Sequence, residues 1–513
     1  MKKIYLSFLL VGSLLTSCDM NELPAGSINE ETAIESVADA LQFRNGIYNN
    51  IRSITNGGYV YYTDMQADLF IGTQSNGNRL GMMSLGTFQA NDTDLESIWA
   101  GPYSCIASVN YFLPKIESVL SKESLSASDR AELVRYRGEA YWARAYYYYY
   151  LADKYCNSYN MCDPKAAATG VPLVTTYSPS GDYSSYPGRS TLEQTFSLIE
   201  TDLKNAYDDL KAYETSGVSG ATANLAPNAI YLSTYTVLAL QARIALLKGD
   251  NDTAIEKAEE LIEGPFSLTD IDDYYELWYN DYGKELIFVP YADLSQSGGV
   301  ASIGNAWNSA NEISSDYIAT SNALNFYDSN NDVRYDWFFE PRAIQVGGST
   351  VAAPCFVKYP GNMALNTGST NAQKNLPKPF RLSETYLILA EAAAAKGDGD
   401  KANKALNALR SKRLYSFEET SYVGSELVSQ IRTERTRELL GEGFRISDLR
   451  RWGQGFTRQI NYTESRYSDV PSIVIQAGVG LTYAPGDHRM ILPIPTGELE
   501  ANPQLAGQQN PGY

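Results

Sequence analysis

Apolar residues recur at three- and four-residue spacing along most of this chain, which is the period of a helix packed on one face. This spacing predicts helices over residues 31–54, 94–119, 127–155, 192–210, 226–248, 424–441 and 444–452. The period is lost over residues 57–91, which we expect to be a long loop, and fades again between residues 265 and 379. Within the second stretch, the apolar run at residues 285–291 predicts a strand. The pattern therefore predicts a mostly α fold with an irregular, loop-rich half that contains a little β-structure.

Two parts of the chain repeat one helix–turn–helix pattern. Residues 248–250 and 396–398 both read Lys-Gly-Asp, and each follows a helix rich in Ala and Leu. Glycine favours the left-handed end of the first helix, and aspartate caps the start of the second. Ala254 and Ala402 then stand at the same spacing, where two helices touch closely. Such a pair resembles a tetratricopeptide unit, which stacks on its neighbours because it cannot bury its faces alone.

The N-terminus is typical of an exported protein. Lys2 and Lys3 precede an apolar run that is too short to span a membrane, so residues 1–17 are predicted to be a signal peptide. The run ends in Leu-Thr-Ser followed by Cys18, which resembles the lipobox of bacterial lipoproteins. We expect Cys18 to be acylated and residues 18–30 to be a tether. The alternative is an ordinary signal peptide that ends near a cysteine. No later stretch is predicted to cross a membrane.

Composition and charge narrow the range of partners. The 513 residues are 44% hydrophobic and 20% charged, as in globular proteins, and their formal net charge is −19. Nucleic acid and anionic membrane surfaces select for basic patches, so neither is expected as a partner. Tyrosine is frequent, and residues 146–150 are five tyrosines in a row. These would surround a helix at about 100° steps, so we expect them mainly to pack against neighbouring elements.

The chain offers little catalytic chemistry. His488 is the only histidine, and no nucleophile motif accompanies it. Carboxylate pairs for glycoside hydrolysis arise by chance among 60 acidic residues, so they do not localise an active site. No metal or cofactor is predicted, although the sequence leaves calcium binding open. A disulfide between Cys156 and Cys162 also stays open, and Cys105 and Cys355 are expected to be small buried residues.

One charged stretch, residues 432–453, stands out near the C-terminus. Its Glu and Arg side chains recur at i,i+3 and i,i+4 spacing in a helix, and a Gly-Glu-Gly break separates them from a second short helix. We expect a structural ion-pair network that locks the two helices. The alternative is a binding surface, in which Arg450, Arg451 and Trp452 supply planar donors and a stacking face.

Several segments together resemble the SusD/RagB family of outer-membrane nutrient-binding lipoproteins. They follow the order of the family and cover nearly the whole chain. These are RAYYYYYLADKY (144–155), GVPL (170–173), RLSETYLILAEA (381–392), ERTRELLGEGFRISDLRRWG (434–453) and LPIPTGELEANPQL (492–505). The spacing between the tyrosine helix and GVPL is wider than the family pattern.

The resemblance implies about four tetratricopeptide-like helix pairs that support an irregular half. It also implies a lipid anchor in the outer membrane on the exterior face, a SusC-like TonB-dependent transporter as partner, and binding of a glycan without cleavage. We divide the chain accordingly into an N-terminal helical region (31–263), a loop-rich ligand-binding insertion (264–379) and a C-terminal family region (380–513). The runner-up is a tetratricopeptide-type scaffold that binds peptide or another non-carbohydrate nutrient.

Sugar-binding residues are expected in the loops, where aromatic faces stack on sugar rings and polar side chains bond to hydroxyls. Trp99 and Trp278 stand beside helical or strand patterns and are expected in the core. The glycan and its linkage do not follow from the sequence. The residues expected to bind the ligand are Asp64, Asp68, Asn76, Arg79, Trp307 and Trp337.

Overall fold

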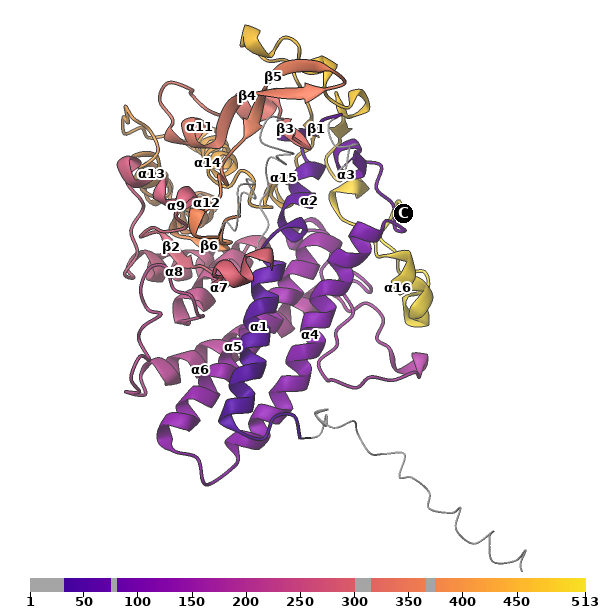
Figure 1. The fold of residues 1–513 in the computed structure, drawn as a ribbon, viewed down its shortest axis with the longest axis vertical. Coiled ribbons are helices and arrows are strands. Elements are labelled where there is room, and N and C mark those ends of the chain that lie inside the picture. The colour runs from indigo at the N-terminus through magenta and orange to yellow at the C-terminus, as the bar shows by residue number, and fades with distance from the viewer. Residues whose placement is uncertain (1–31, 75–80, 300–314, 366–373) are drawn as a thin grey trace, which may run out of the picture.

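The computed structural model describes residues 32–74, 81–299, 315–365 and 374–513, which form a mostly helical protein (Figure 1). The longer helices are α1 (Val37–Ile54), α4 (Thr93–Leu120), α5 (Ala127–Tyr155), α6 (Leu192–Glu214), α7 (Thr234–Lys248), α8 (Asn251–Ile262), α12 (Leu382–Ala395), α13 (Gly399–Arg410) and α14 (Gly424–Glu438). The short helices include α2 (Gly58–Gln66), α3 (Gly81–Leu85), α9 (Glu276–Tyr279), α10 (Ser321–Leu324), α11 (Val333–Phe338), α15 (Arg445–Arg451) and α16 (Thr496–Ala501).

The strands of the described ranges form four antiparallel pairs and no larger sheet. They are β1 (Phe70–Gly72) with β3 (Tyr317–Ala319), β2 (Leu286–Phe288) with β6 (Phe380–Arg381), β4 (Phe339–Val346) with β5 (Ser349–Phe356), and β7 (Phe456–Thr457) with β8 (Thr482–Tyr483). The mostly α fold predicted from the sequence is confirmed, with β2 lying inside the predicted strand.

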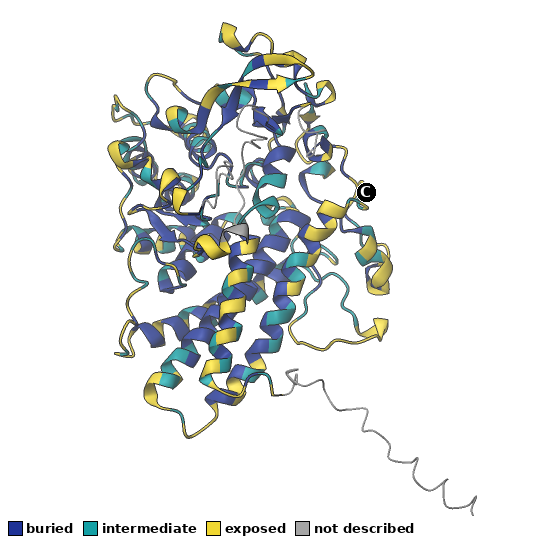
Figure 2. Cartoon of the chain, viewed as in Figure 1, coloured by how far each residue is buried: buried dark blue, intermediate teal, exposed yellow. Residues whose placement is uncertain are grey.

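The long helices α1, α4, α5 and α6 pack side by side in the lower half of Figure 1. Buried and exposed positions alternate along them at helical spacing, as the colours of Figure 2 show. Helix α1 begins six residues later than predicted, because Ser36 caps it in a reciprocal pair of hydrogen bonds with Asp39. The other three begin within one residue of the predicted positions.

Both Lys-Gly-Asp turns join a packed helix pair, as predicted. Gly249 (φ 77°) follows α7 and Gly397 (φ 82°) follows α12, both in the left-handed conformation that favours glycine. The side chains of Asp250 and Asp398 accept hydrogen bonds from backbone N–H groups in the first turns of α8 and α13. Helices α8 and α12 also pack together, so the two pairs stack into one layer.

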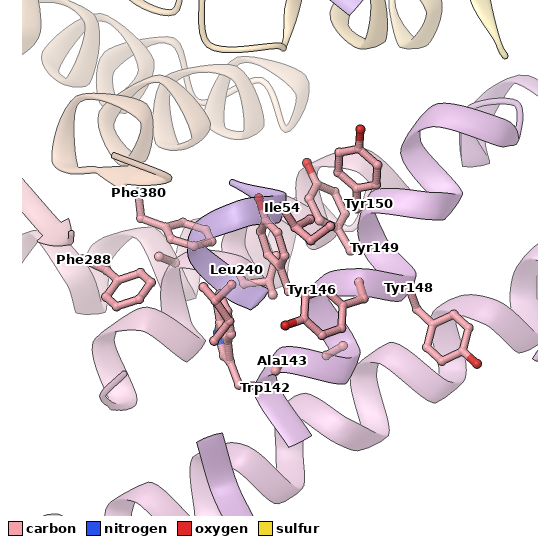
Figure 3. Close-up of a cluster of buried hydrophobic side chains, with 14 of the residues drawn as sticks. Ile54, Trp142, Ala143, Tyr146, Tyr148, Tyr149, Tyr150, Leu240, Phe288 and Phe380 are labelled. Carbon is pink, nitrogen blue, oxygen red and sulfur yellow. The ribbon is translucent and has the colours of Figure 1, made fainter. Parts of the chain in front are cut away.

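The five consecutive tyrosines of α5 are packed inside the protein, as expected. Figure 3 shows Tyr146, Tyr148, Tyr149 and Tyr150 within a cluster of buried side chains. Tyr146 to Tyr150 are each 7% exposed or less. The Tyr146 ring stacks on Trp142 with 5.2 Å between centroids, and the Tyr150 hydroxyl donates to the Tyr59 carbonyl at 2.9 Å. Because α5 is enclosed by helices on several sides, aromatic residues can surround it and stay buried.

The two stretches predicted as irregular hold more regular structure than expected. Residues 57–91 contain α2, β1 and α3, so the prediction of one long loop was wrong. Residues 264–379 contain the β4–β5 hairpin, whose two-residue turn is Gly347-Gly348 with positive φ at both positions. Two glycines allow the turn that matches strand twist. The hairpin was missed because its strands alternate only weakly between apolar and polar residues.

A buried ion-pair network lies at the centre of the molecule. The carboxylate of Glu438, at the end of α14, accepts hydrogen bonds from Arg334 of α11 (3.0 Å), Arg381 of β6 (2.8 Å) and Arg413 (3.0 and 3.1 Å). All four side chains are 1% exposed or less. Burial alone would raise the pKa of Glu438, but the three guanidinium charges hold it well below its usual value. Within the charged stretch, Arg435 of α14 pairs with Asp448 of α15 at 2.8 Å, so the predicted ion-pair network that locks these two helices is confirmed.

The cysteines within the described residues form no disulfide. Cys156 and Cys162 are both free thiols, and Cys105 and Cys355 are free and buried. No helix in the described ranges combines the length and apolar character that a membrane span requires.

Replacing Glu438 by glutamine should lower the free energy of unfolding by about 3–5 kcal/mol, because the buried arginines lose the charge that balances them. Chemical denaturation monitored by circular dichroism measures this loss. The matched control is Asp208→Asn, since Asp208 pairs with Lys204 at 2.6 Å on the surface. Such pairs contribute about 1 kcal/mol or less. Equal losses in the two variants would contradict a central role for Glu438.

Candidate functional site

Three aromatic side chains meet at the surface where α9 lies against α11. The ring of Trp337 is half-buried and contacts Tyr275 and Tyr279, with centroids 6.2 and 5.7 Å apart. Tyr275 and Tyr279 are 38% and 43% exposed. Contacting aromatic rings that remain open to solvent are suited to stack on a flat, partly apolar ligand. We call these three residues the Trp337 patch.

The sequence of α9 separates an outer from an inner face. Tyr275 and Tyr279 are four residues apart and project outward, whereas Tyr274 and Trp278, with the same spacing, are buried. On α11, Phe338 follows Trp337 and points into the core, where its ring lies 5.8 Å from Trp278. The buried rings therefore fix the backbone from which the patch projects.

A buried aspartate holds the chain just after α9. Asp281 has a positive φ of 52°, and its carboxylate accepts hydrogen bonds from the Asn375 side chain at 2.9 Å and the Leu376 N–H at 3.0 Å. Lys378 donates to the same carboxylate at 2.5 Å. These contacts tie α9 to a distant segment, so the patch rests on a rigid support.

Polar groups border the patch. Asn280 donates to the Glu276 carboxylate at 2.5 Å, and the Tyr415 hydroxyl donates to Asp336 at 2.7 Å. Hydrogen bonds from Asn280 and Tyr275 lower the pKa of Glu276, so its carboxylate is charged at neutral pH. The rim thus offers carboxylate acceptors and an amide beside aromatic faces, which is the combination that recognises polyhydroxylated ligands.

The expected ligand-binding residues fall into three groups. Trp337 lies in the patch. Asp64 and Asp68 are only 2% and 3% exposed and hold the chain together, since Asp64 accepts from the Gly443 N–H at 2.8 Å and Asp68 accepts two bonds from Arg445 at 2.8 and 2.9 Å. Neither carboxylate faces solvent, which corrects their expected place on the surface. Asn76, Arg79 and Trp307 lie outside the described residues, as does the predicted lipidation site Cys18.

Two patch residues were not anticipated from the sequence. Tyr275 and Tyr279 belong to YYELWY, residues 274–279, where two aromatic pairs at four-residue spacing mark an inner and an outer face. That signal was present, but so short a helix gives little periodicity. Trp99 and Trp278 were expected in the core, and both are buried.

A metal centre finds no support in the described ranges, where no group of three or more His, Cys, Asp or Glu side chains is arranged to hold an ion. The aromatic faces and their polar rim supply non-covalent contacts.

Comparison with known families identifies the chain. Residues 304–513 match the family described as "SusD family", and residues 21–223 match the one described as "Starch-binding associating with outer membrane". The chain belongs to the SusD/RagB family. The matched ranges include the tyrosine helix α5 and the charged stretch at residues 432–453.

Solved SusD structures share this fold over nearly the whole chain. A SusD superfamily protein from Bacteroides thetaiotaomicron is 26% identical, with a TM-score of 0.74 over 93% of this chain and 100% of its own. A putative sugar binding protein from Bacteroides vulgatus is 25% identical, with a TM-score of 0.72 over 94% and 99%. A SusD-like carbohydrate binding protein from Bacteroides vulgatus, 18% identical with a TM-score of 0.69, covers 92% and 98% and shows the fold alone. No curated protein matches the chain.

The burial of Asp64 makes the stability of this SusD-family protein depend on pH. Burial raises the pKa of its carboxyl from 3.8 to about 7, against the opposing effects of the Gly443 N–H, Lys154 and Lys358. The folded protein therefore holds this proton more tightly than the unfolded chain does. Its contribution to stability is complete below about pH 4 and is lost as the pH rises through 7.

The variant Asp64→Asn keeps an oxygen that accepts from Gly443 but has no charge to gain. We expect the free energy of unfolding of the variant, minus that of the wild type, to increase from about pH 4 to about pH 7 and then to level off. Urea denaturation at a series of pH values measures this difference. A difference that does not change with pH would contradict the assignment.

Proposed function

We propose that this protein captures a glycan at the cell surface and delivers it to a SusC-like TonB-dependent transporter in the outer membrane. It binds the glycan without cleaving it, and a lipid on Cys18 anchors it to the membrane with the protein on the exterior face. Membership of the SusD/RagB family supports this proposal, as does the likeness to a putative sugar binding protein from Bacteroides vulgatus that is 25% identical.

The Trp337 patch is the observation that carries the proposal. Sugar rings have flat apolar faces, formed by C–H groups, and hydroxyls around the edge. Stacked aromatic side chains remove those faces from water, and nearby carboxylates and amides bond to the hydroxyls. Tyr275, Tyr279 and Trp337 provide the faces, and Glu276 and Asn280 provide hydrogen-bonding groups beside them.

Further ligand contacts are assigned to the loops. Asn76, Arg79 and Trp307 remain proposed as binding residues on their residue types and on their place in the family pattern. Because Trp307 and Trp337 belong to the same insertion, residues 264–379, we assign that insertion to ligand binding.

Titration with a panel of neutral oligosaccharides tests the glycan-binding role. For the tightest ligand, Trp337→Ala and Tyr279→Ala should each weaken affinity about 5- to 30-fold, because a stacking face worth roughly 1–2 kcal/mol is lost. Isothermal titration calorimetry measures the change. The matched control is Tyr183→Ala, which removes a tyrosine that is 57% exposed in another part of the chain.

The results also separate the alternatives. Unchanged affinity in both patch variants would remove the patch from the site. Release of shorter sugars from a bound oligosaccharide would reveal hydrolysis. Binding of peptides in preference to every oligosaccharide would favour a tetratricopeptide-type scaffold for a non-carbohydrate nutrient.

Membrane anchoring is tested through Cys18. The variant Cys18→Ala should move the protein from the membrane fraction to the soluble fraction, because the acylated side chain is lost. Cell fractionation and immunoblotting measure the distribution, and a TonB-dependent transporter should co-purify with the anchored wild type. The control is Cys162→Ala, which removes a half-buried free thiol and should stay with the membrane. A Cys18→Ala protein that remains membrane-bound would overturn the anchor.

A further inference from the structure

A polar groove runs between α14 and α15, away from the Trp337 patch. It has a volume of about 840 Å³, part of which is open to solvent. Four hydroxyl side chains of α14 line it at three- or four-residue spacing, and Phe326 and Trp452 also belong to its lining. The hydroxyl residues are Ser425, Ser429, Thr433 and Thr436. The groove therefore offers a row of hydrogen-bonding groups on one helix face.

One arginine in this groove has no acidic partner. Within the described part of the chain, the Arg432 guanidinium makes no ion pair and donates no hydrogen bond, and its buried Nε lacks an acceptor. It lies over the Trp452 ring, 5.1 Å from the centroid. A half-buried cation with unused donors is unfavourable unless something else supplies the acceptor.

The other arginines of the same stretch are paired. Arg435 bonds to Asp448 at 2.8 Å, Arg437 to Glu434 at 3.2 Å, Arg445 to Asp68, Arg450 to Asp153 and Arg451 to Glu391. This contrast singles out Arg432, because each neighbouring guanidinium has a carboxylate partner and this one has none within the described residues.

The carboxylate with the strongest electrostatic influence on Arg432 is already occupied. Glu391 accepts two hydrogen bonds from Arg451, at 2.5 and 2.7 Å, and one from Trp452 Nε1 at 2.8 Å. The positive charge of Arg451 is also close enough to repel Arg432. Asp448, the other carboxylate that acts on Arg432, is bonded to Arg435 and Arg451. Neither carboxylate bonds to Arg432, so its donors remain available to an anionic group in the groove.

We propose that this groove binds the oxyanion of an acidic sugar, either the carboxylate of a uronic acid or a sulfate ester. Arg432 holds the oxyanion, because its planar donors match two oxygens at once. Ser425, Ser429 and Thr433 then bond to hydroxyls of the same sugar; their own hydroxyls have no hydrogen bond to any other described residue. The volume suits a ligand of one or two sugar rings.

A sugar fits the groove better than an acidic protein segment does. Grooves that bind a helix or an extended peptide offer apolar pockets for its side chains. This groove instead presents four hydroxyl side chains beside Arg432 and the Asp68-paired Arg445. The charge also differs from the Trp337 patch, whose rim carries Glu276 and Asp336 and repels anions. The groove is therefore a second site, and its ligand class goes beyond the neutral stacking proposed for the patch.

Calorimetric titration of the purified protein tests the groove with three disaccharides of matched size: one with a uronate, one with a sulfate and one neutral. The uronate or the sulfate should bind more tightly than the neutral sugar. Arg432→Gln should weaken that binding tenfold or more, and Arg432→Lys should weaken it less, because charge remains but the planar fork is lost. The comparison of uronate with sulfate identifies the oxyanion.

Two further variants make the result decisive. Ser429 is exposed on α14, so Ser429→Trp fills the groove while Arg432 stays in place, and it should also abolish binding of the acidic sugar. The matched control is Arg466→Gln, which removes the same charge from an exposed ion pair and should leave binding unchanged. If Arg432→Gln fails to fold, the inference is tested by Ser429→Trp alone.

Three outcomes would overturn the inference that the groove binds an acidic sugar. Equal affinity for acidic and neutral sugars would do so, as would acidic-sugar binding that survives both Arg432→Gln and Ser429→Trp. Binding of an acidic peptide in place of every acidic sugar would assign the groove to a protein partner. These results do not test the proposed binding of neutral oligosaccharides at the Trp337 patch, which is tested separately by the Trp337→Ala and Tyr279→Ala variants.

Discussion

Burying a charge is unfavourable unless every buried charge is paired, and this constraint governs the centre of the protein. Glu438 has no contact with water, yet it satisfies guanidinium groups from α11, from β6 and from the segment after α13. Removing any one of these segments would leave an unpaired charge in the interior. The network therefore fixes how the segments in the second half of the chain pack together. Apolar contacts alone would fix their relative positions less strictly, because they have no preferred direction.

The same network supports the proposed ligand surface. Arg334 and Trp337 lie three residues apart on α11, so the contacts that hold Arg334 also orient the helix that carries Trp337. On the other side, the ammonium of Lys358 lies 4.6 Å from the Trp278 ring centroid, beneath the outward-facing tyrosines of α9. A surface held this firmly loses little conformational freedom when a ligand arrives, which favours affinity.

The sequence predicts the helical scaffold well because local signals and burial agree there. Helix α5 and the two Lys-Gly-Asp turns follow from spacing, capping and glycine geometry alone. Prediction from the sequence is less accurate where contacts between distant segments determine the position of a side chain. Asp64 and Asp68 resemble loop carboxylates in the sequence, and only their distant partners Gly443 and Arg445 reveal that they are structural. Tyr275 and Tyr279 gain their significance from Trp337, which lies 62 and 58 residues further along the chain.

The charged stretch shows why residue type alone does not distinguish a core network from a binding group. Its arginines look alike in the sequence, but Arg435 is balanced by Asp448 whereas Arg432 faces an open groove. The net charge of −19 does not cancel this difference, because charges more than about 8 Å apart across solvent are largely screened at physiological ionic strength. The carboxylates near Arg432, Glu391 and Asp448, are bonded to other arginines, so a strongly acidic protein can still present free guanidinium donors to an anion.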